Sequence, residues 1–111
     1  MGTILVDTTQ VTAAGWVTIV SIRFIESFDK LLIHVFETIG DESILYRVQV
    51  SNDVNFAGVE TLGDRYGDYA WIVAAGGSDF QSICDCWGWI RVQIIDGDAT
   101  GTARCIITGT T

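Results

Sequence analysis

The feature that most constrains this chain is a regular alternation of short β-prone runs with glycine-rich and acidic clusters. The runs are rich in Val, Ile, Thr, Trp and Tyr, which suit a pleated, half-buried surface, whereas glycine and aspartate suit tight turns. The clusters are AAG at 13–15, GDES at 40–43, GDRYGD at 63–68, GG at 76–77 and DGDATG at 96–101. This rhythm predicts an all-β fold.

Nine strands are expected from these runs, near 3–11, 16–25, 31–38, 44–52, 57–62, 69–74, 79–84, 86–95 and 102–109. A chain of 111 residues has the length of one domain, so we expect residues 1–111 to form a single unit. The chain has twelve glycines and no proline, so its turns must be built from Gly, Asp, Asn and Ser. We therefore predict an antiparallel two-sheet β-sandwich or jelly roll.

The clearest alternation is ILYRVQVSN at 44–52. Its apolar face carries Ile44, Tyr46, Val48 and Val50, and its wet face carries Leu45, Arg47, Gln49 and Ser51. The segment FIESFDKLLIHVFETIG has apolar residues at helical spacings, but Ile33, Val35 and Phe36 are poor helix formers. We predict a strand there.

The stretch CDCWGWIRVQI at 84–94 looks most like chemistry, with two cysteines, two tryptophans and an arginine. If it is extended, Cys84, Cys86 and the following even positions form an apolar face, and the odd positions form a mixed face. DGDATG is suited to an antiparallel hairpin with the next strand, which would place Cys105 opposite Ile90 or Val92. In either register Cys105 lies about 13 Å or more from Cys86, too far for a shared metal or a disulfide.

The same register gathers aromatic and arginine side chains on the other face. We predict an interface there, because exposed aromatics with arginines are concentrated at protein interfaces; its residues are Trp87, Trp89, Arg91, Gln93 and Arg104. Two alternatives stay open: a covering segment or a bulge at Gly88 that turns Trp87 inward, and a carbohydrate-stacking platform.

Catalytic and metal-binding patterns are weak. The only histidine, His34, lies in an apolar run, and no Gly-x-Ser-x-Gly elbow or phosphate-binding loop is present. Asp96 and Asp98, with Asp79 or Asp85, could be imagined around calcium, but their spacing fits turns better than an EF-hand loop. We expect no catalytic residues, no metal site and no cofactor.

Charge and cysteine content restrict the partners further. The formal net charge of −8 would repel nucleic acid. The start MGTILVDTTQ resembles neither a signal peptide nor a membrane span, so we expect synthesis in the cytosol and no membrane partner. Three cysteines without a framework spacing are expected to be reduced, buried thiols.

Two segments, YRVQVSNDVNFAGVETLGD at 46–64 and WGWIRVQIIDGDATGTARCIITG at 87–109, resemble small β-sandwich structural proteins of tailed bacteriophages. The first resembles a strand that ends in a Ser-x-Asp turn with an aromatic residue three positions on, here Ser51, Asp53 and Phe56. The second resembles their closing hairpin. Val54 follows Asp53 where a glycine is common.

This resemblance implies a non-enzymatic virion protein: a capsid decoration or cement protein, or a tail or fibre module. It also implies association with other copies, as a trimer or another symmetric ring, and binding to a major capsid or tail protein. The expected location is the virion, and the host cytoplasm during assembly. The alternative is a carbohydrate-binding or receptor-binding β-sandwich module.

Overall fold

The computed structural model describes residues 2–23, 29–39, 43–61, 70–83, 88–96 and 101–110. These contain nine strands: β1 (Thr3–Val11), β2 (Val17–Arg23), β3 (Lys30–Ile39), β4 (Ile44–Ser51), β5 (Glu60–Thr61), β6 (Trp71–Val73), β7 (Ser78–Ile83), β8 (Trp89–Ile95) and β9 (Thr102–Thr110). The predicted all-β class is confirmed, and each strand lies within a few residues of its expected position. The strand prediction for the LLIHVF segment is also confirmed, because it forms β3.

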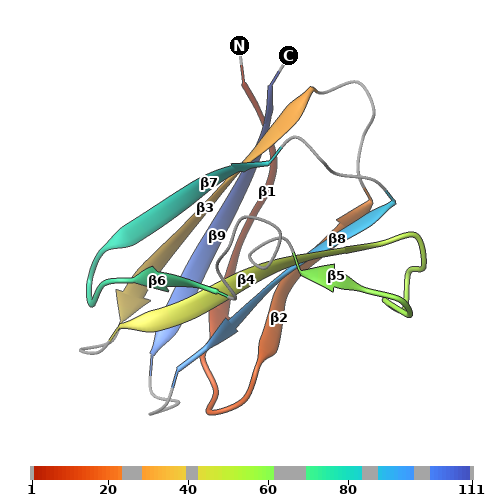
Figure 1. The fold of residues 1–111 in the computed structure, drawn as a ribbon. Helices are drawn as coiled ribbons and strands as arrows, with labels where there is room; N and C mark the ends of the chain where they lie inside the picture. Colours follow the sequence, from red (N-terminus) through yellow and green to blue (C-terminus); the bar gives the residue numbers. More distant parts are fainter. Residues whose placement is uncertain are drawn as a thin grey trace.

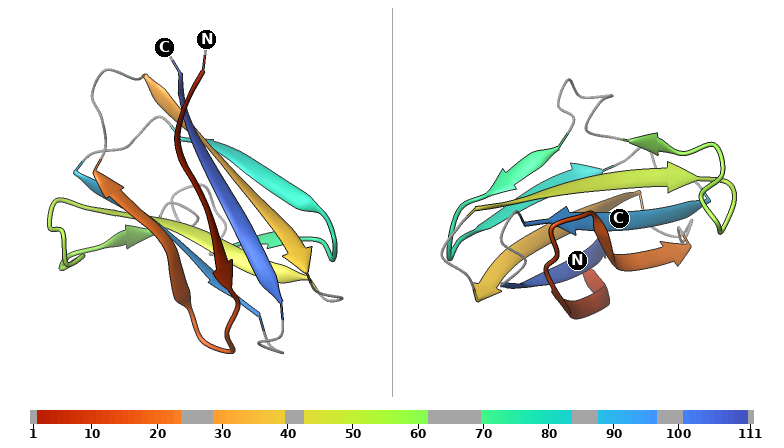
Figure 2. Two further views of the ribbon diagram at one scale, coloured as in Figure 1. Left: turned by 180° about the vertical axis from the view of Figure 1, so that it is seen from behind. Right: turned by 90° about the horizontal axis from the view of Figure 1, so that it is seen from below.

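The strands form two antiparallel sheets packed face to face, as Figures 1 and 2 show. One sheet has the order β1-β9-β3-β7, and the other has the order β2-β8-β4-β5 with β6 also paired to β4. The first strand therefore pairs with the last, and the second pairs with the last but one. This order is that of a jelly roll, which is the second of the two predicted architectures.

Strands β5 and β6 share one edge of the second sheet. β5 pairs with Gln49 and Val50 near the end of β4, whereas β6 pairs with Ile44 to Tyr46 at its beginning. Both pairings are antiparallel and lie on the side of β4 opposite β8. The two short strands thus occupy the place of one strand, interrupted in sequence by residues 62–70.

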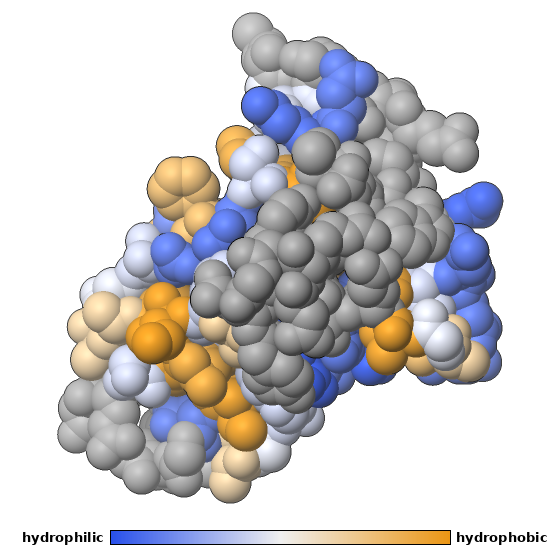
Figure 3. All heavy atoms as spheres, viewed as in Figure 1, coloured by the Kyte–Doolittle hydropathy of each residue, from blue (hydrophilic) through white to orange (hydrophobic). Residues whose placement is uncertain are grey.

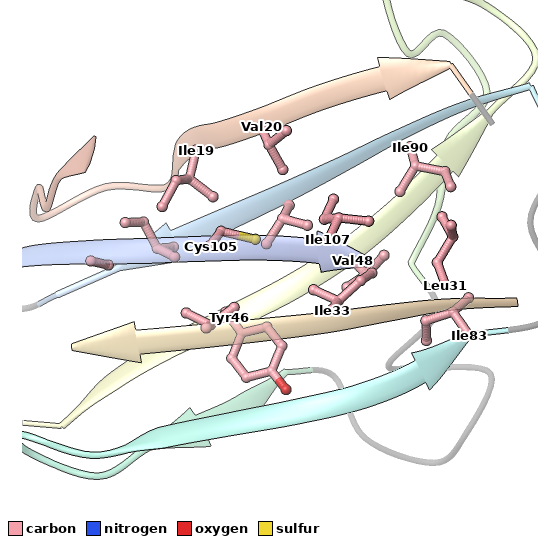
Figure 4. Close-up of a cluster of buried hydrophobic side chains, with 14 of the residues drawn as sticks. Ile19, Val20, Leu31, Ile33, Tyr46, Val48, Ile83, Ile90, Cys105 and Ile107 are labelled. Atoms are coloured by element: carbon pink, nitrogen blue, oxygen red, sulfur yellow. The ribbon is translucent and has the colours of Figure 1, made fainter. Parts of the chain in front are cut away.

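The core lies between the inward faces of the two sheets (Figure 4). The apolar face predicted for β4 is confirmed, because its four even-numbered residues, from Ile44 to Val50, are all buried. The predicted wet face is only partly correct, because Gln49 and Ser51 on that side are buried as well, at 4% and 2% exposure. The even-numbered residues Ile90, Val92 and Ile94 of β8 are buried as well, and so are Ala103, Cys105 and Ile107 of β9. Removing these apolar side chains from water is the main stabilising term of the fold.

Within the described residues, a hydrogen bond joins β4 of one sheet to β7 of the other. The hydroxyl of Tyr46 on β4 donates to Oδ2 of Asp79 on β7 at 2.6 Å. The Tyr46 ring is fully buried and packs against Trp71. Figure 4 shows this ring reaching from β4 towards β7. Because a buried hydroxyl without a partner is costly, the Asp79 carboxylate stabilises the position of this large side chain.

The predicted hairpin between β8 and β9 is wrong. β8 pairs with β2 and β4, whereas β9 pairs with β1 and β3 in the other sheet. Cys105 therefore lies in the ladder beside Thr8 and Val35, not opposite Ile90 or Val92.

The ends of the DGDATG segment show why the chain changes sheet there. The hydroxyl of Thr12 donates to the Asp96 carboxylate at 3.2 Å and accepts from the Gly101 amide at 3.0 Å. The Asp96 amide also donates to the carbonyl of Ala13. Asp96 at the end of β8 and Gly101 before β9 are thus both held against the connection from β1 to β2.

Candidate contact face

The outward side of β2, β8 and β4, with β6 at its edge, carries Arg23, Arg47, Arg91 and Trp89; we call it the contact face. Strand pairing arranges its residues in four rows. The rows are Ile72–Leu45–Ile95, Arg47–Gln93–Thr18, Gln49–Arg91–Ser21 and Ser51–Trp89–Arg23. The residues between them on each strand point into the core, so the alternation of the sheet fixes which side chains share this surface.

Arg47 is held from two sides. Its Nε–H donates to Oε1 of Gln93 at 2.9 Å, and its Cζ lies 4.1 Å from the centre of the Trp16 ring. Gln93 in turn donates from Nε2 to the hydroxyl of Thr18 at 3.2 Å. Because Gln93 is only 8% exposed, it orients the arginine rather than forming a contact surface itself.

Arg91 repeats this arrangement in the next row, with the strands exchanged. Its Nε–H donates to Oε1 of Gln49 at 2.7 Å, and its Cζ lies 4.4 Å from the centre of the Phe56 ring. Burial lowers the pKa of Arg91, and the charge of the neighbouring Arg47 lowers it further. Two guanidinium groups are therefore kept close together by neutral amides and aromatic rings.

Phe56 reaches its place over Arg91 through an unusual backbone. Its φ is 58°, in the left-handed region that side chains other than glycine rarely adopt. The turn that follows β4 supports this conformation: Asp53 accepts from the amides of Asn55 and Phe56, and Ser51 donates to the carbonyl of Ala57. Strain of this kind persists where the surroundings enforce it, often at functional surfaces.

An exposed apolar row borders the two arginines. Ile72 is 65% exposed and Leu45 is 38% exposed, and the two side chains are paired across β6 and β4. In Figure 3, apolar surface gathers in the area that β6 and the start of β4 occupy in Figure 1. Apolar side chains beside oriented arginines match the composition of protein interfaces.

Gly88 determines how β8 enters this face. Its φ is +63°, and an added Cβ would lie 2.4 Å from the carbonyl oxygen of Ser51 and 2.9 Å from the Cα of Asn52. Only glycine fits, because both the backbone conformation and the close approach to β4 exclude a side chain. Trp89 follows directly and stays on the outward side, paired with Ser51 and Arg23.

The structure places the five predicted interface residues on different surfaces. Trp89 and Arg91 lie together on the contact face, and Gln93 lies beneath Arg47. Arg104 lies on the outer side of the other sheet, because β9 does not pair with β8. Trp87 lies outside the described residues, as do Cys84 and Cys86. The prediction that Arg104 lies beside the tryptophans is therefore wrong.

Sequence reasoning missed the supporting residues Trp16, Gln49 and Phe56 as parts of the site. Alternation in ILYRVQVSN had placed Gln49 on the wet face, and the turn at 51–56 had been expected from the resemblance. The sequence did not indicate that β4 pairs with β8, and this pairing brings each arginine opposite a glutamine.

The acidic, histidine and thiol side chains of the described ranges make local structural contacts. Within these ranges no group of three or more His, Cys, Asp and Glu could hold a metal ion. Glu37 is buried and accepts from the Gly76 amide, and His34 is a strand residue whose Nε2 lies 3.0 Å from the Ser78 hydroxyl. Cys105 is fully buried, as predicted, and burial raises the pKa of its thiol to about 12.

Comparisons with known proteins give no relative: no protein-family model, no curated protein and no solved structure matches this chain. Over its described residues, the structure contains no helix of the length and apolarity needed to cross a membrane.

Proposed function

We propose that this protein is a non-enzymatic virion structural protein, most simply a capsid decoration or cement protein. It binds other copies of itself and a major capsid or tail protein, and it is located in the host cytoplasm during assembly and then in the virion. The virion part of this proposal rests on the resemblance of residues 46–64 and 87–109 to phage β-sandwich proteins. The binding part rests on the contact face.

The observation that carries the binding role is the combination of an exposed apolar row with two oriented arginines on one side of one sheet. The exposed side chains of the apolar row supply apolar surface that association would remove from water. The fixed guanidinium groups supply specificity. Arg47 and Arg91 are already immobilised by glutamines and rings, so their ordering costs little entropy on binding.

Size-exclusion chromatography with light scattering tests self-association. We expect wild-type protein to form a trimer or another symmetric ring at high concentration, and Ile72→Asp to weaken it. The matched control is Phe80→Asp, because Phe80 is 63% exposed, close to the 65% of Ile72, but lies on the opposite sheet. Equal effects of the two substitutions would place the association elsewhere.

Co-sedimentation with virus particles from the source of this gene tests the virion role. We expect the wild-type protein to sediment with capsids or tails and Ile72→Asp to remain in the supernatant. A protein that stays monomeric at high concentration and does not sediment with particles would contradict the proposal.

The second candidate is a carbohydrate-binding or receptor-binding module, and Trp89 is the observation that favours it. Trp89 is half-buried on the contact face, and no ring or guanidinium in the described part of the chain stacks on it. A glycan array gives the test. Hits that disappear in Trp89→Ala would support this role, and an array without hits would remove it.

A further inference from the structure

Strand β7 lies at one edge of the first sheet and differs from the other edge strands of the fold. It pairs with β3 alone, in an unbroken register that runs from Leu31 with Ile83 to Phe36 with Ser78 (Figure 1). The edge strands β1 and β2 each contain a register shift, and β5 and β6 are only two and three residues long. Bulges and short strands protect sheet edges against further pairing. Among the described strands, β7 is therefore the longest edge strand with an unbroken register.

The other side of β7 can accept an additional strand. Every second residue of an edge strand points its backbone N–H and C=O groups away from the sheet. Within the described residues, no strand pairs with this side of β7. An extended segment that added there would form main-chain hydrogen bonds and continue the first sheet, as in recognition by β-augmentation.

Two side chains of β7 determine what such a segment must carry. Phe80 is 63% exposed on the outer side of the sheet, in one row with His34 and Ile106. Asp79 is half-buried on the inner side, where its Oδ2 accepts a hydrogen bond from the Tyr46 hydroxyl. Its Oδ1 makes no hydrogen bond within the described residues. A matching segment has a β-branched or aromatic residue opposite Phe80 and a basic residue opposite Asp79.

We propose that the free edge of β7 binds an extended segment of the partner capsid or tail protein, added antiparallel to β7 with a basic residue opposite Asp79. This inference rests on the proposed binding of a capsid or tail protein, and it names the surface and the chemistry of that contact. Self-association uses the contact face, on the other sheet, and leaves this edge available.

Charge favours a basic partner segment over a second copy of β7. If two β7 strands paired antiparallel about Phe80, each Asp79 would lie opposite Gln81 of the other copy, and β7 has no Lys or Arg that could replace it. An inward-pointing charge on an edge strand discourages pairing with a strand that does not neutralise it. A formal net charge of −8 attracts a basic segment, whereas a second copy brings the same negative charge.

The hexapeptide acetyl-Val-Thr-Gln-Ile-Lys-Thr-amide is the probe, because antiparallel addition places its Ile opposite Phe80 and its Lys opposite Asp79. Its binding is measured by ¹H–¹⁵N spectra and by amide hydrogen exchange of the wild-type protein. We expect shifts of the β7 signals and slower exchange at alternate residues of β7, which are the ones that face the added strand. No binding at millimolar concentration would overturn the site.

The charge of the segment is tested by replacing Lys of the probe with Glu. We expect this change to weaken binding by about fivefold, because an opposite-charge pair across two strands becomes a like-charge pair. In Asp79→Asn most of this difference should disappear, and thermal unfolding checks that the variant is folded. Equal binding of the two peptides to the wild-type protein would contradict the role of Asp79.

Phe80→Ala tests the outer side of the edge. We expect it to weaken binding of the Lys peptide by about threefold, since the cross-strand pair with Ile is lost. Ile72→Asp is the matched control, because Ile72 is exposed to a similar extent but lies on the contact face, and its affinity for the peptide should equal that of the wild type. Equal losses in the two variants would overturn the site.

Two N-methylated forms of the peptide test the backbone pairing. One carries N-methyl groups at the alternate residues whose amides face β7, and it should not bind. The other carries them at the residues that face away, and it should still bind. Equal binding of the two forms would show that the segment does not add as a strand.

Three further outcomes separate this inference from the alternatives and from the proposed function. Slower exchange of the same β7 amides at rising protein concentration, without peptide, would overturn the partner segment in favour of a second copy. If wild-type protein and Phe80→Asp sediment equally well with virus particles, the β7 edge fails as the partner site while the virion role stands. If the peptide binds at β7 but the protein neither assembles nor sediments with particles, the edge site stands and the virion role fails.

Discussion

The outer faces of the two sheets use arginine in opposite ways. On the β1-β9-β3-β7 sheet, Arg104 donates from Nε and Nη2 to both carboxylate oxygens of Asp7, at 2.7 and 2.6 Å. On the contact face, Arg47 and Arg91 are oriented by the neutral amides of Gln93 and Gln49. The Asp7 carboxylate neutralises Arg104 within the chain, whereas the Gln49 amide orients Arg91 and leaves its charge in place.

Apolar exposure, in contrast, does not distinguish the two faces. The outer side of the first sheet carries Phe80, 63% exposed, next to His34 and Phe36, whose rings contact each other with centroids 3.9 Å apart. Ile72 on the contact face is 65% exposed. The two faces therefore differ in how Arg104 and Arg91 are bound, and they do not differ in the exposure of their apolar side chains.

The largest expected effect concerns the core that both faces share. Cys105 lies on the inner side of β9, fully buried, and burial raises the pKa of its thiol to about 12. In a chain with Cys84→Ser and Cys86→Ser, we expect native Cys105 to react with a thiol reagent at least about a thousandfold more slowly than in urea, because reaction requires opening of the core. Because the thiol pKa is lower in the unfolded chain, stability is also expected to fall as the pH rises from about 9 towards 12.

Ser82→Cys, in a chain whose three natural cysteines are replaced by serine, is the control for this experiment. Ser82 is exposed on β7, so its replacement should react rapidly in the native protein. Equal rates for native and unfolded Cys105 would mean that the two sheets do not form a closed core, and the comparison of their outer faces would lose its basis.

The next largest effect is expected from a substitution at Gly88, where β8 enters the contact face. Gly88→Ala introduces a Cβ within 2.4 Å of the Ser51 carbonyl oxygen at a residue with φ +63°. We expect the free energy of unfolding to fall by about 3 kcal/mol, because backbone strain and overlap add. Gly76→Ala is the control, since its φ is +68° but nothing lies within 4 Å of its added Cβ; it should cost only about 1 kcal/mol. Similar urea-unfolding curves for the two variants would contradict the role assigned to the close approach.

A smaller effect concerns the bond that joins the two sheets. Tyr46→Phe removes the donor to Asp79, and we expect a loss of about 1 to 2 kcal/mol in urea unfolding. Asp79→Asn should cause a comparable loss, and the double variant should lose less than the sum, because both changes break the same contact. Strict additivity of the two losses would show that the Tyr46 hydroxyl and the Asp79 carboxylate act independently.

The success and the failure of sequence reasoning have one physical cause. Alternation of apolar and polar residues depends on neighbours along one strand. The even-numbered residues from Ile44 to Val50 and from Ile90 to Ile94 were therefore assigned correctly to the core. Glycine and aspartate clusters likewise located the strand ends. Which strand lies beside which depends on contacts distant in sequence, such as those of Thr12 with Asp96 and Gly101, and no local pattern contains them.

The candidate site was predictable to the same extent. Trp89 and Arg91 were assigned to one surface because they are two residues apart on one strand. Arg104 was predicted beside them only because β8 and β9 were expected to form a hairpin. Since these strands lie in different sheets, the prediction for Arg104 is wrong. Gln49 and Phe56 complete the surroundings of Arg91, and their roles follow from the β4–β8 register and the turn after β4.

The smallest expected effect sharpens the contrast between the arginines. The hydrogen bond from Arg104 holds the pKa of the exposed Asp7 carboxyl below its usual value, and the pair raises the pKa of Arg104. Its stabilisation is therefore present above the pKa of an unfolded aspartate and lost as the pH falls through the folded one. We expect Arg104→Gln to lower the melting temperature slightly at neutral pH and low salt, and the difference from wild type to vanish in high salt and at acid pH.

Arg91→Gln should show no such loss on acidification, because no described carboxylate pairs with Arg91, and removing its charge relieves the repulsion from Arg47. If acid or salt removed the same stabilisation from both arginines, Arg91 would also have a carboxylate partner within the chain, and the distinction between the two faces would fail.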